Sequence, residues 1–252
     1  MKIYIRLLFT LSIIAASAKY SSIYAQTAMM DSLRNVLISS SAPKNKIDAL
    51  NTIAFNLRSK KTDSAKIFSY QAIAWSKKEN YHTGIGVACI TLGNIHYTVD
   101  NDSALYYFKQ AQQAFIIEPT NLLRTTRVLN GITNTYIQKT QFDSALYYAN
   151  FTIDYIKNSK DTGKVKTERL MYAFGSLANT HYAASNYDKS IENYIKAGEI
   201  GEKINNIEML VVYYSGIANI QGTLGNFEKA IQYGEKSIEA AQQVKDFPSL
   251  IL

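Results

Sequence analysis

A small residue recurs along this chain at nearly even intervals, each time just after a short polar stretch. The series is Ala65, Ala104, Ala145, Ser190 and Ala230. Within this frame the hexapeptide DSALYY occurs twice, at Asp102–Tyr107 and Asp143–Tyr148. A period of about 40 residues predicts that the chain is built from successive copies of one supersecondary unit.

Two further series of small residues keep the same frame. The first lies eleven or twelve residues upstream, each member after a branched apolar residue: Ala54, Gly93, Thr133, Ala178 and Ala218. The second lies seven residues downstream: Ala72, Ala111, Thr152, Ala197 and Ser237. Helices that cross closely need small side chains at the crossing, because contact residues set the distance between their axes. Each unit is therefore predicted to be a pair of antiparallel helices.

Polar residues and prolines mark the expected helix starts. Asp102, Asp143 and Asp188 precede the small residue of the second helix, where a carboxylate can accept hydrogen bonds from free N–H groups. We expect these aspartates to act as helix caps. All three prolines, Pro43, Pro119 and Pro248, fall just before the first helix of a pair, where a missing N–H has no cost.

The predicted fold is thus all-α, with five helix pairs. The expected pairs lie near residues 44–80, 81–118, 119–160, 161–205 and 206–245, after a cap helix and linker at 26–43. Residues 246–252 would begin an incomplete sixth pair. Their sequence ends in the apolar PSLIL, whereas a repeat stack normally ends in a helix with a polar outer face. We therefore hypothesise that the natural polypeptide continues past Leu252 or that this chain is a truncated product.

Residues 1–25 have the layout of a secretory signal peptide. Lys2 and Arg6 precede the apolar run Leu7–Ala16, and small residues follow. Cleavage after Ala25 is the preferred interpretation; cleavage after Ala18 and an uncleaved anchor are the alternatives. The layout predicts an exported protein in a periplasmic or extracytoplasmic location.

The charge balance argues against nucleic acid as a partner. Without residues 1–25, which carry three basic residues and no acid, the net charge falls from +7 to +4. The remaining lysines and arginines form no stripe interleaved with aromatic residues.

In these features the chain resembles the tetratricopeptide repeat (TPR) family. The matching features are the branched and small residues of the first helix, an aromatic residue at the turn, such as Tyr187 or Phe227, and the small residue of the second helix. The period is longer than the family's usual length of about 34 residues. It resembles the long-period bacterial subgroup, including exported TPR sensor regions of signalling proteins. The resemblance implies a right-handed superhelical α-solenoid whose first helices line a concave groove.

The sequence contains no motif that predicts catalysis. HExxH, CxxC, GxSxG and Walker-type patterns do not occur. His96 and His181 each lie three residues after the small residue of a first helix, which is a packing position. Cys89 lies in an apolar stretch and is expected to be buried. We predict no enzyme activity, no cofactor and no metal site.

An asparagine follows the small residue of four first helices, giving the row Asn94, Asn134, Asn179 and Asn219. An amide can both donate to and accept from a peptide backbone. The resemblance implies that this row clasps a peptide, with Tyr97, Arg127 and Tyr182 as neighbours. The alternative is that the amides form hydrogen bonds between helices. No dense cluster of lysines and arginines occurs along the sequence, which disfavours a dedicated carboxylate clamp.

These patterns favour an exported, non-enzymatic scaffold that holds a peptide or protein segment in its groove. The alternative is the sensory ectodomain of a TPR-containing histidine kinase or helix-turn-helix regulator whose membrane and output parts lie beyond residue 252. A third possibility is a structural role through self-association. The membrane is expected to be contacted only through the export signal or a missing C-terminal span.

Overall fold

A computed structural model describes residues 28–119 and 121–246. A first helix spans residues 28–39. The helices after it are α2 (Pro43–Leu57), α3 (Thr62–Lys78), α4 (His82–His96), α5 (Asn101–Ile117), α6 (Leu122–Gln138), α7 (Phe142–Asn158), α8 (Gly163–Ala183), α9 (Tyr187–Ile204), α10 (Ile207–Thr223) and α11 (Phe227–Asp246). The predicted all-α solenoid of five helix pairs is confirmed. The expected signal peptide and the PSLIL end lie outside the described residues.

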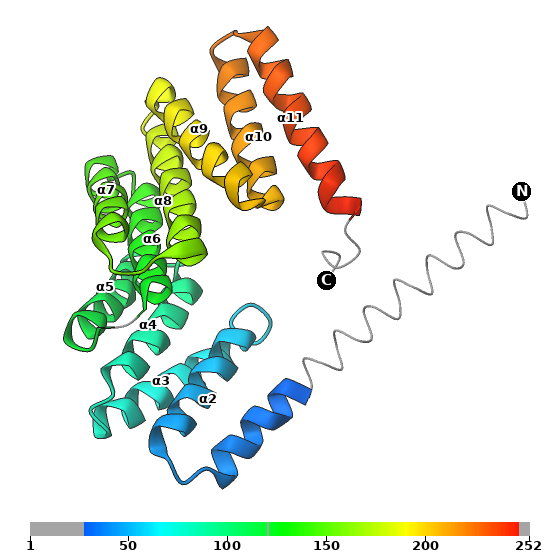
Figure 1. Cartoon of the computed structure of the whole chain (residues 1–252). Coiled ribbons are helices and arrows are strands. Elements are labelled where there is room, and N and C mark those ends of the chain that lie inside the picture. The colour runs from blue at the N-terminus through cyan, green and yellow to red at the C-terminus, as the bar shows by residue number, and fades with distance from the viewer. Residues whose placement is uncertain (1–27, 120, 247–252) are drawn as a thin grey trace, which may run out of the picture.

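The helix pairs follow one another along an arc that curves around an open centre (Figure 1). Each helix packs against the next one along the chain. The first helices of successive pairs also touch, since α2 contacts α4, α4 contacts α6 and α6 contacts α8. This second set of contacts makes α2, α4, α6 and α8 one continuous layer.

The repeated small residues lie at the helix crossings. Ala65, Ala104, Ala145 and Ser190 are fully buried, as are Ala54, Thr133 and Ala178 of the first helices. The hydroxyl of Ser190 also donates to the backbone oxygen of Ala178 at 2.8 Å, which links α9 to α8 at their crossing. In the last pair Ala230 and Ala218 are only half-buried.

Glycines let aromatic rings bridge neighbouring pairs. The ring of the buried Phe108 lies against both Gly93 of α4 and Gly131 of α6. A Cβ at either glycine would stand 2.6–2.7 Å from a ring carbon. Because a methyl group fits in neither place, close packing of three helices around one ring requires glycine at both positions.

The prediction that the repeated aspartates cap their helices is wrong. Asp102, Asp143 and Asp188 lie inside the first turns of α5, α7 and α9. The residue that caps α5 is Asp100, which accepts hydrogen bonds from the backbone nitrogens of Asp102 and Ser103 at 3.0 and 3.2 Å. Each helix begins earlier than the motif indicated. The repeated aspartate therefore stabilises the helix through its negative charge near the positive helix end.

One turn geometry closes five of the helices. A residue with positive φ follows the helix, and the next residue's N–H bonds to a carbonyl five residues back. The positive-φ residues are Asn80, Thr140, Ser185, Asn205 and Gly225. This arrangement satisfies carbonyls at the helix end and reverses the chain within a few residues. It permits antiparallel packing inside a pair and between pairs.

Candidate functional site

A groove crosses the inner layer of first helices. Its cavity of about 200 Å³ is lined by Asn51, Thr52 and Phe55 of α2, Val87 and Ile90 of α4, and Arg124 and Arg127 of α6. On each helix the lining residues include a pair spaced by three or four, as residues on one helical face are. Three successive helix pairs therefore contribute to a common hollow.

The predicted row of asparagines is exposed to solvent on successive first helices. Asn94, Asn134, Asn179 and Asn219 lie on α4, α6, α8 and α10, each directly after a residue of the crossing. Asn134 follows Arg127 by seven residues, which is two helical turns or about 10 Å along α6. On α6 the amide therefore lies two turns away from the groove-lining arginine.

Two of the four asparagine side chains, those of Asn179 and Asn219, have specific neighbours. The side-chain oxygen of Asn179 accepts a hydrogen bond from the hydroxyl of the buried Tyr194 on α9. Asn219 lines a wide depression of about 700 Å³ between α10 and α11. The interpretation as helix-to-helix hydrogen bonding thus fits Asn179.

The predicted tyrosines lie near the C-terminal ends of their helices. The hydroxyl of Tyr97, directly after α4, accepts a hydrogen bond from Nε2 of Gln138 on α6 at 3.3 Å. Tyr182 of α8 is 45% exposed, and its ring centroid lies 6.0 Å from that of Tyr187. Tyr97 connects two pairs, whereas Tyr182 is available to a partner.

Four arginines from distant parts of the sequence form an electrostatically linked cluster. Partial burial lowers the pKa of the Arg127 guanidinium, whose side chain is still exposed to solvent, and the positive charges of Arg169, Arg58 and Arg124 lower that pKa further. These four arginines come from three helices or their ends. The expectation that the chain has no dedicated carboxylate clamp stays a prediction.

The arginine side chains are held by their own neighbours. The guanidinium of Arg58 lies 3.7 Å from the ring centre of Phe55 and donates to the Phe55 carbonyl at 2.6 Å. Arg169 lies over the ring of Tyr172 at 4.6 Å and forms an ion pair with Glu168 at 3.3 Å. The Nε of Arg169 is buried and has no hydrogen-bond partner within the protein.

A signal for this cluster was present in the repeat frame. Arg124 and Arg169 each lie nine residues before the small residue of their helix, Thr133 and Ala178. Equal register on neighbouring helices of a layer places side chains on the same side.

Asn51, which lines the groove, carries a buried acceptor. Its side chain is 2% exposed, and its Nδ2 donates to the Gly84 carbonyl at 3.0 Å. Its Oδ1 has no hydrogen-bond partner within the protein. A buried acceptor without a partner is costly, so this oxygen suits a buried water molecule.

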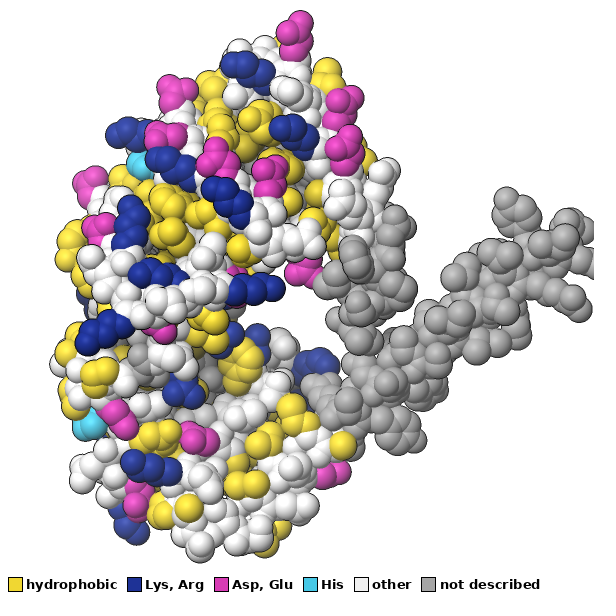
Figure 2. Space-filling model, in the orientation of Figure 1, with side chains coloured by type: hydrophobic (Ala, Val, Ile, Leu, Met, Phe, Trp, Pro, Cys, Tyr) yellow, Lys and Arg dark blue, Asp and Glu magenta, His cyan; other side chains and the backbone are white. Residues whose placement is uncertain are grey.

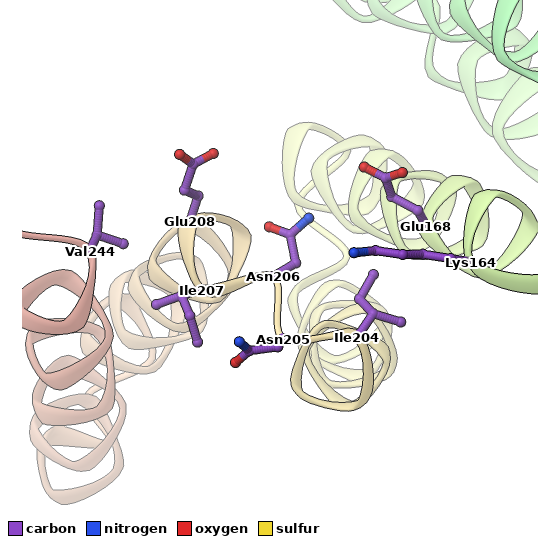
Figure 3. A pocket seen from close by; sticks show the side chains of 8 residues that line it. All are labelled: Lys164, Glu168, Ile204, Asn205, Asn206, Ile207, Glu208 and Val244. Atoms are coloured by element: carbon purple, nitrogen blue, oxygen red, sulfur yellow. The ribbon is translucent and has the colours of Figure 1, made fainter. Parts of the chain in front are cut away.

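A second pocket, of about 330 Å³, lies where α8 begins and α9 turns into α10. Figure 3 shows Lys164 reaching from α8 toward Asn206, with Glu168 beside it. The Asn206 oxygen already accepts from the Met209 backbone nitrogen at 3.2 Å and so caps α10. The pocket carries charges of both signs and shares Glu168 with the arginine cluster.

The remaining candidates for chemistry are packed into the fold. Cys89 is buried, and burial raises the pKa of its thiol to about 12. The described residues contain no group of three or more His, Cys, Asp or Glu that could hold a metal ion. Across the same described ranges, no helix is both long and apolar enough to cross a bilayer.

One family model matches part of the chain. The tetratricopeptide repeat model matches residues 169–243. No curated protein sequence matches the chain.

Solved structures match most of the chain at low sequence identity. The apo form of RapI has a TM-score of 0.68 and 15% identity over 80% of this chain and 72% of that one. BtubC from P. vanneervenii has a TM-score of 0.71 and 12% identity over 89% and 91%. The apo quorum sensor NprR from B. thuringiensis has a TM-score of 0.66 and 16% identity over 94% and 65%. NprR has also been solved with its cognate peptide NprX.

Proposed function

We propose that this chain, whose residues 169–243 are tetratricopeptide repeats and whose helix pairs share the fold of TPR-like proteins, is a non-enzymatic scaffold that binds an extended peptide segment along its inner layer. The observation that carries the proposal is the row of four exposed asparagines at one register of successive first helices. Exposed amides at a regular spacing match a ligand whose own donors and acceptors repeat, as those of an extended backbone do.

The fold similarity supports the same class of partner. NprR, whose structure resembles this chain, binds the peptide NprX. The groove across α2, α4 and α6 offers apolar side chains beside polar ones, as peptide grooves commonly do.

The first prediction concerns two asparagines with different surroundings. Asn134→Ala should weaken peptide binding about twofold to tenfold, since a net hydrogen bond is worth about 0.5–1.5 kcal/mol, and should leave thermal stability unchanged. Asn179→Ala should lower the free energy of unfolding by about 1–3 kcal/mol, because it leaves the Tyr194 hydroxyl without its acceptor. Binding is measured on an array of octapeptides, and stability by thermal melting.

Asn150→Ala is the matched control, because this amide lies on α7 and donates only to the Leu146 carbonyl of its own helix. It should leave peptide binding intact. A scaffold role for the whole row is indicated instead if Asn134→Ala destabilises the protein as much as Asn179→Ala. Failure of the wild-type protein to retain any octapeptide overturns the proposed function.

A second candidate function is a sensory ectodomain of a signalling protein. It is favoured by the leader-like residues 1–25. Under this proposal the protein acts in the periplasm or outside the cell, and its ligand controls a separate output domain. Mass spectrometry of the mature N-terminus in cell fractions tests the export step, with cleavage after Ala25 expected.

A further inference from the structure

The second helices of successive pairs leave a cleft on the outer side of the stack. Helices α5 and α7 both pack against α6, and they have no extensive contact with each other. A cavity of about 240 Å³ lies between them, with residues of α6 at its base. It shares no lining residue with the inner groove that crosses the first helices. The cavity is therefore a separate feature of the molecule.

The base and one wall of this cavity are apolar. Phe115 of α5 and Val128 and Leu129 of α6 form the base and are at most 6% exposed. Phe151 and Tyr155 of α7 form the wall, with ring centroids 6.4 Å apart. Side chains that border a space lose the contacts that atoms in that space would give them. A ligand that fills the cavity with apolar atoms would restore these contacts.

Two apolar residues at the edge of the cavity depart from the pattern of the repeat. Ile116 lies twelve residues after the small residue of α5, and Phe151 lies six residues after that of α7. The other four pairs have polar or charged residues at both registers. These are Lys77, Lys157, Glu202 and Gln242 at the first register, and Gln71, Gln110, Lys196 and Lys236 at the second. Large apolar side chains thus occupy these two registers only on the helices that border this cavity, although Ile116 is 64% and Phe151 40% exposed.

The aromatic wall continues outside the cavity. The exposed ring of Tyr147, one helical turn before Phe151, is stacked with it at a centroid distance of 6.2 Å and an interplanar angle of 12°. In the space-filling view hydrophobic side chains reach the surface along the outer edge of the arc, where α5 and α7 lie (Figure 2). Rings arranged in this way present flat apolar faces on which a planar ligand can stack.

The volume and the lining of the cavity define a class of ligand. An apolar cavity of about 150 Å³ accommodates benzene, so 240 Å³ admits two fused rings or one ring with a short substituent. None of the described residues that line it carries a charge, so a charged group would lose its hydration without a counter-ion. Gln112, Thr125 and Tyr155 provide hydrogen-bonding groups for a polar atom of the ligand.

We propose that the cleft between α5 and α7 binds a small neutral aromatic molecule, whose ring stacks on Phe151 and packs against Val128 and Leu129. Ile116 covers the ligand from the side of α5. This inference is independent of the proposed peptide-binding function, because the cleft lies between second helices and is formed by other residues.

Indole is a suitable probe, since it is a neutral two-ring compound with one N–H donor. A titration followed by NMR should show saturable binding to the wild-type protein, with nuclear Overhauser contacts from indole to the methyl groups of Ile116, Val128 and Leu129. Indole-3-acetate, which carries a carboxylate at pH 7, should bind at least about tenfold more weakly, because no lining residue offsets its charge.

Two substitutions introduce the residue types that the other pairs carry at these registers. Phe151→Gln should weaken indole binding about tenfold, because it removes the aromatic surface. Ile116→Lys should weaken it by at least as much, because it brings a charge to the cavity. Both side chains are exposed, so the melting temperature should stay unchanged. Ile67→Lys in α3 is the matched control, since Ile67 is also 64% exposed and does not line the cavity.

Each outcome supports or overturns the inference. Absence of saturable indole binding, contacts from indole to other methyl groups, or full binding in both Phe151→Gln and Ile116→Lys overturns it. Equal affinity for indole-3-acetate overturns the assignment to neutral ligands. If a variant melts at a lower temperature, the contacts measured in the wild-type protein decide. Self-association of the wild-type protein that Ile116→Lys abolishes in analytical ultracentrifugation, without indole binding, assigns the cleft to a second copy of the chain and overturns the inference.

Discussion

At the scale of single residues, the two tyrosines of DSALYY have different environments. The inner one packs on the first helix of its pair, since the ring centroid of Tyr107 lies 5.5 Å from that of His96 and Tyr148 lies 5.6 Å from Tyr136. The outer ones, Tyr106 and Tyr147, are 59% and 64% exposed. One repeated dipeptide therefore supplies a packing contact and a surface ring.

His181 gives a pH-dependent prediction at this scale. Burial, and next the charge of Lys189, lower its pKa below the ordinary value of 6.5, while Glu192 acts in the opposite direction. The folded state prefers the neutral ring, so its contribution to stability is present above the unfolded pKa of about 6.5 and is lost as the pH falls toward the folded pKa.

The melting temperature should therefore fall between pH 7.5 and 5.5, and His181→Gln should make that fall smaller. Thermal melts across this range measure the effect. Parallel pH profiles for the two proteins would show that protonation of His181 does not contribute.

At the scale of elements, stacking depends on glycines that face aromatic rings. Gly131 of α6 meets Phe108, Gly175 of α8 meets Tyr213, and Gly216 of α10 meets Tyr194. Each ring comes from a neighbouring pair, so each such contact fixes the distance between helices of successive pairs. Glycine is needed at these positions because the ring leaves no room for a side chain, and not because of its backbone freedom.

Gly131→Ala should lower the free energy of unfolding by about 1–3 kcal/mol, because the added methyl group would overlap the buried Phe108 ring. Gly234→Ala is the matched control in α11. Nothing lies within 4 Å of its added Cβ, and alanine in a helix interior should stabilise it by about 0.5–1 kcal/mol. Urea denaturation measures both, and equal effects of the two substitutions would contradict the packing argument.

At the scale of the whole molecule, the helix pairs form a one-dimensional stack in which each pair depends on its neighbours. The last described pair has a neighbour on one side among these residues. Its apolar side chains are correspondingly exposed, including Phe227 at 68%, Ile231 at 63% and Ile238 at 59%. Local stability should therefore decrease toward α11.

Native-state hydrogen exchange tests this gradient. Amides in the middle of α5, around the fully buried Ala104 and Ala111, should exchange only through large-scale opening. Amides of α11 around the half-buried Ala230 should exchange at a lower opening free energy. Equal protection of α5 and α11 would show that the stack unfolds as a single cooperative unit.

The sequence by itself determined the fold, because the repeat unit is local. Small residues at fixed spacing indicate where two helices cross. The short polar turns between the helices require the two helices of a pair to pack antiparallel. Five pairs and the buried Ala104, Ala145 and Ser190 follow from this spacing alone. The same periodicity placed Asn94 and Asn134 on exposed positions of the first helices, while their role in binding stays a prediction.

Only the tertiary structure decided which of those side chains share a site. The positive charges of Arg58 and Arg169 act on Arg127, although the three residues come from different helices and lie far apart along the sequence. The hydrogen bond from the Tyr194 hydroxyl to the Asn179 side chain is a second example, because it depends on how α9 packs against α8. Periodicity gives the face on which a side chain lies. The angle between successive helix pairs decides which charges meet across the groove, and that angle arises from the packing of all the contact residues together.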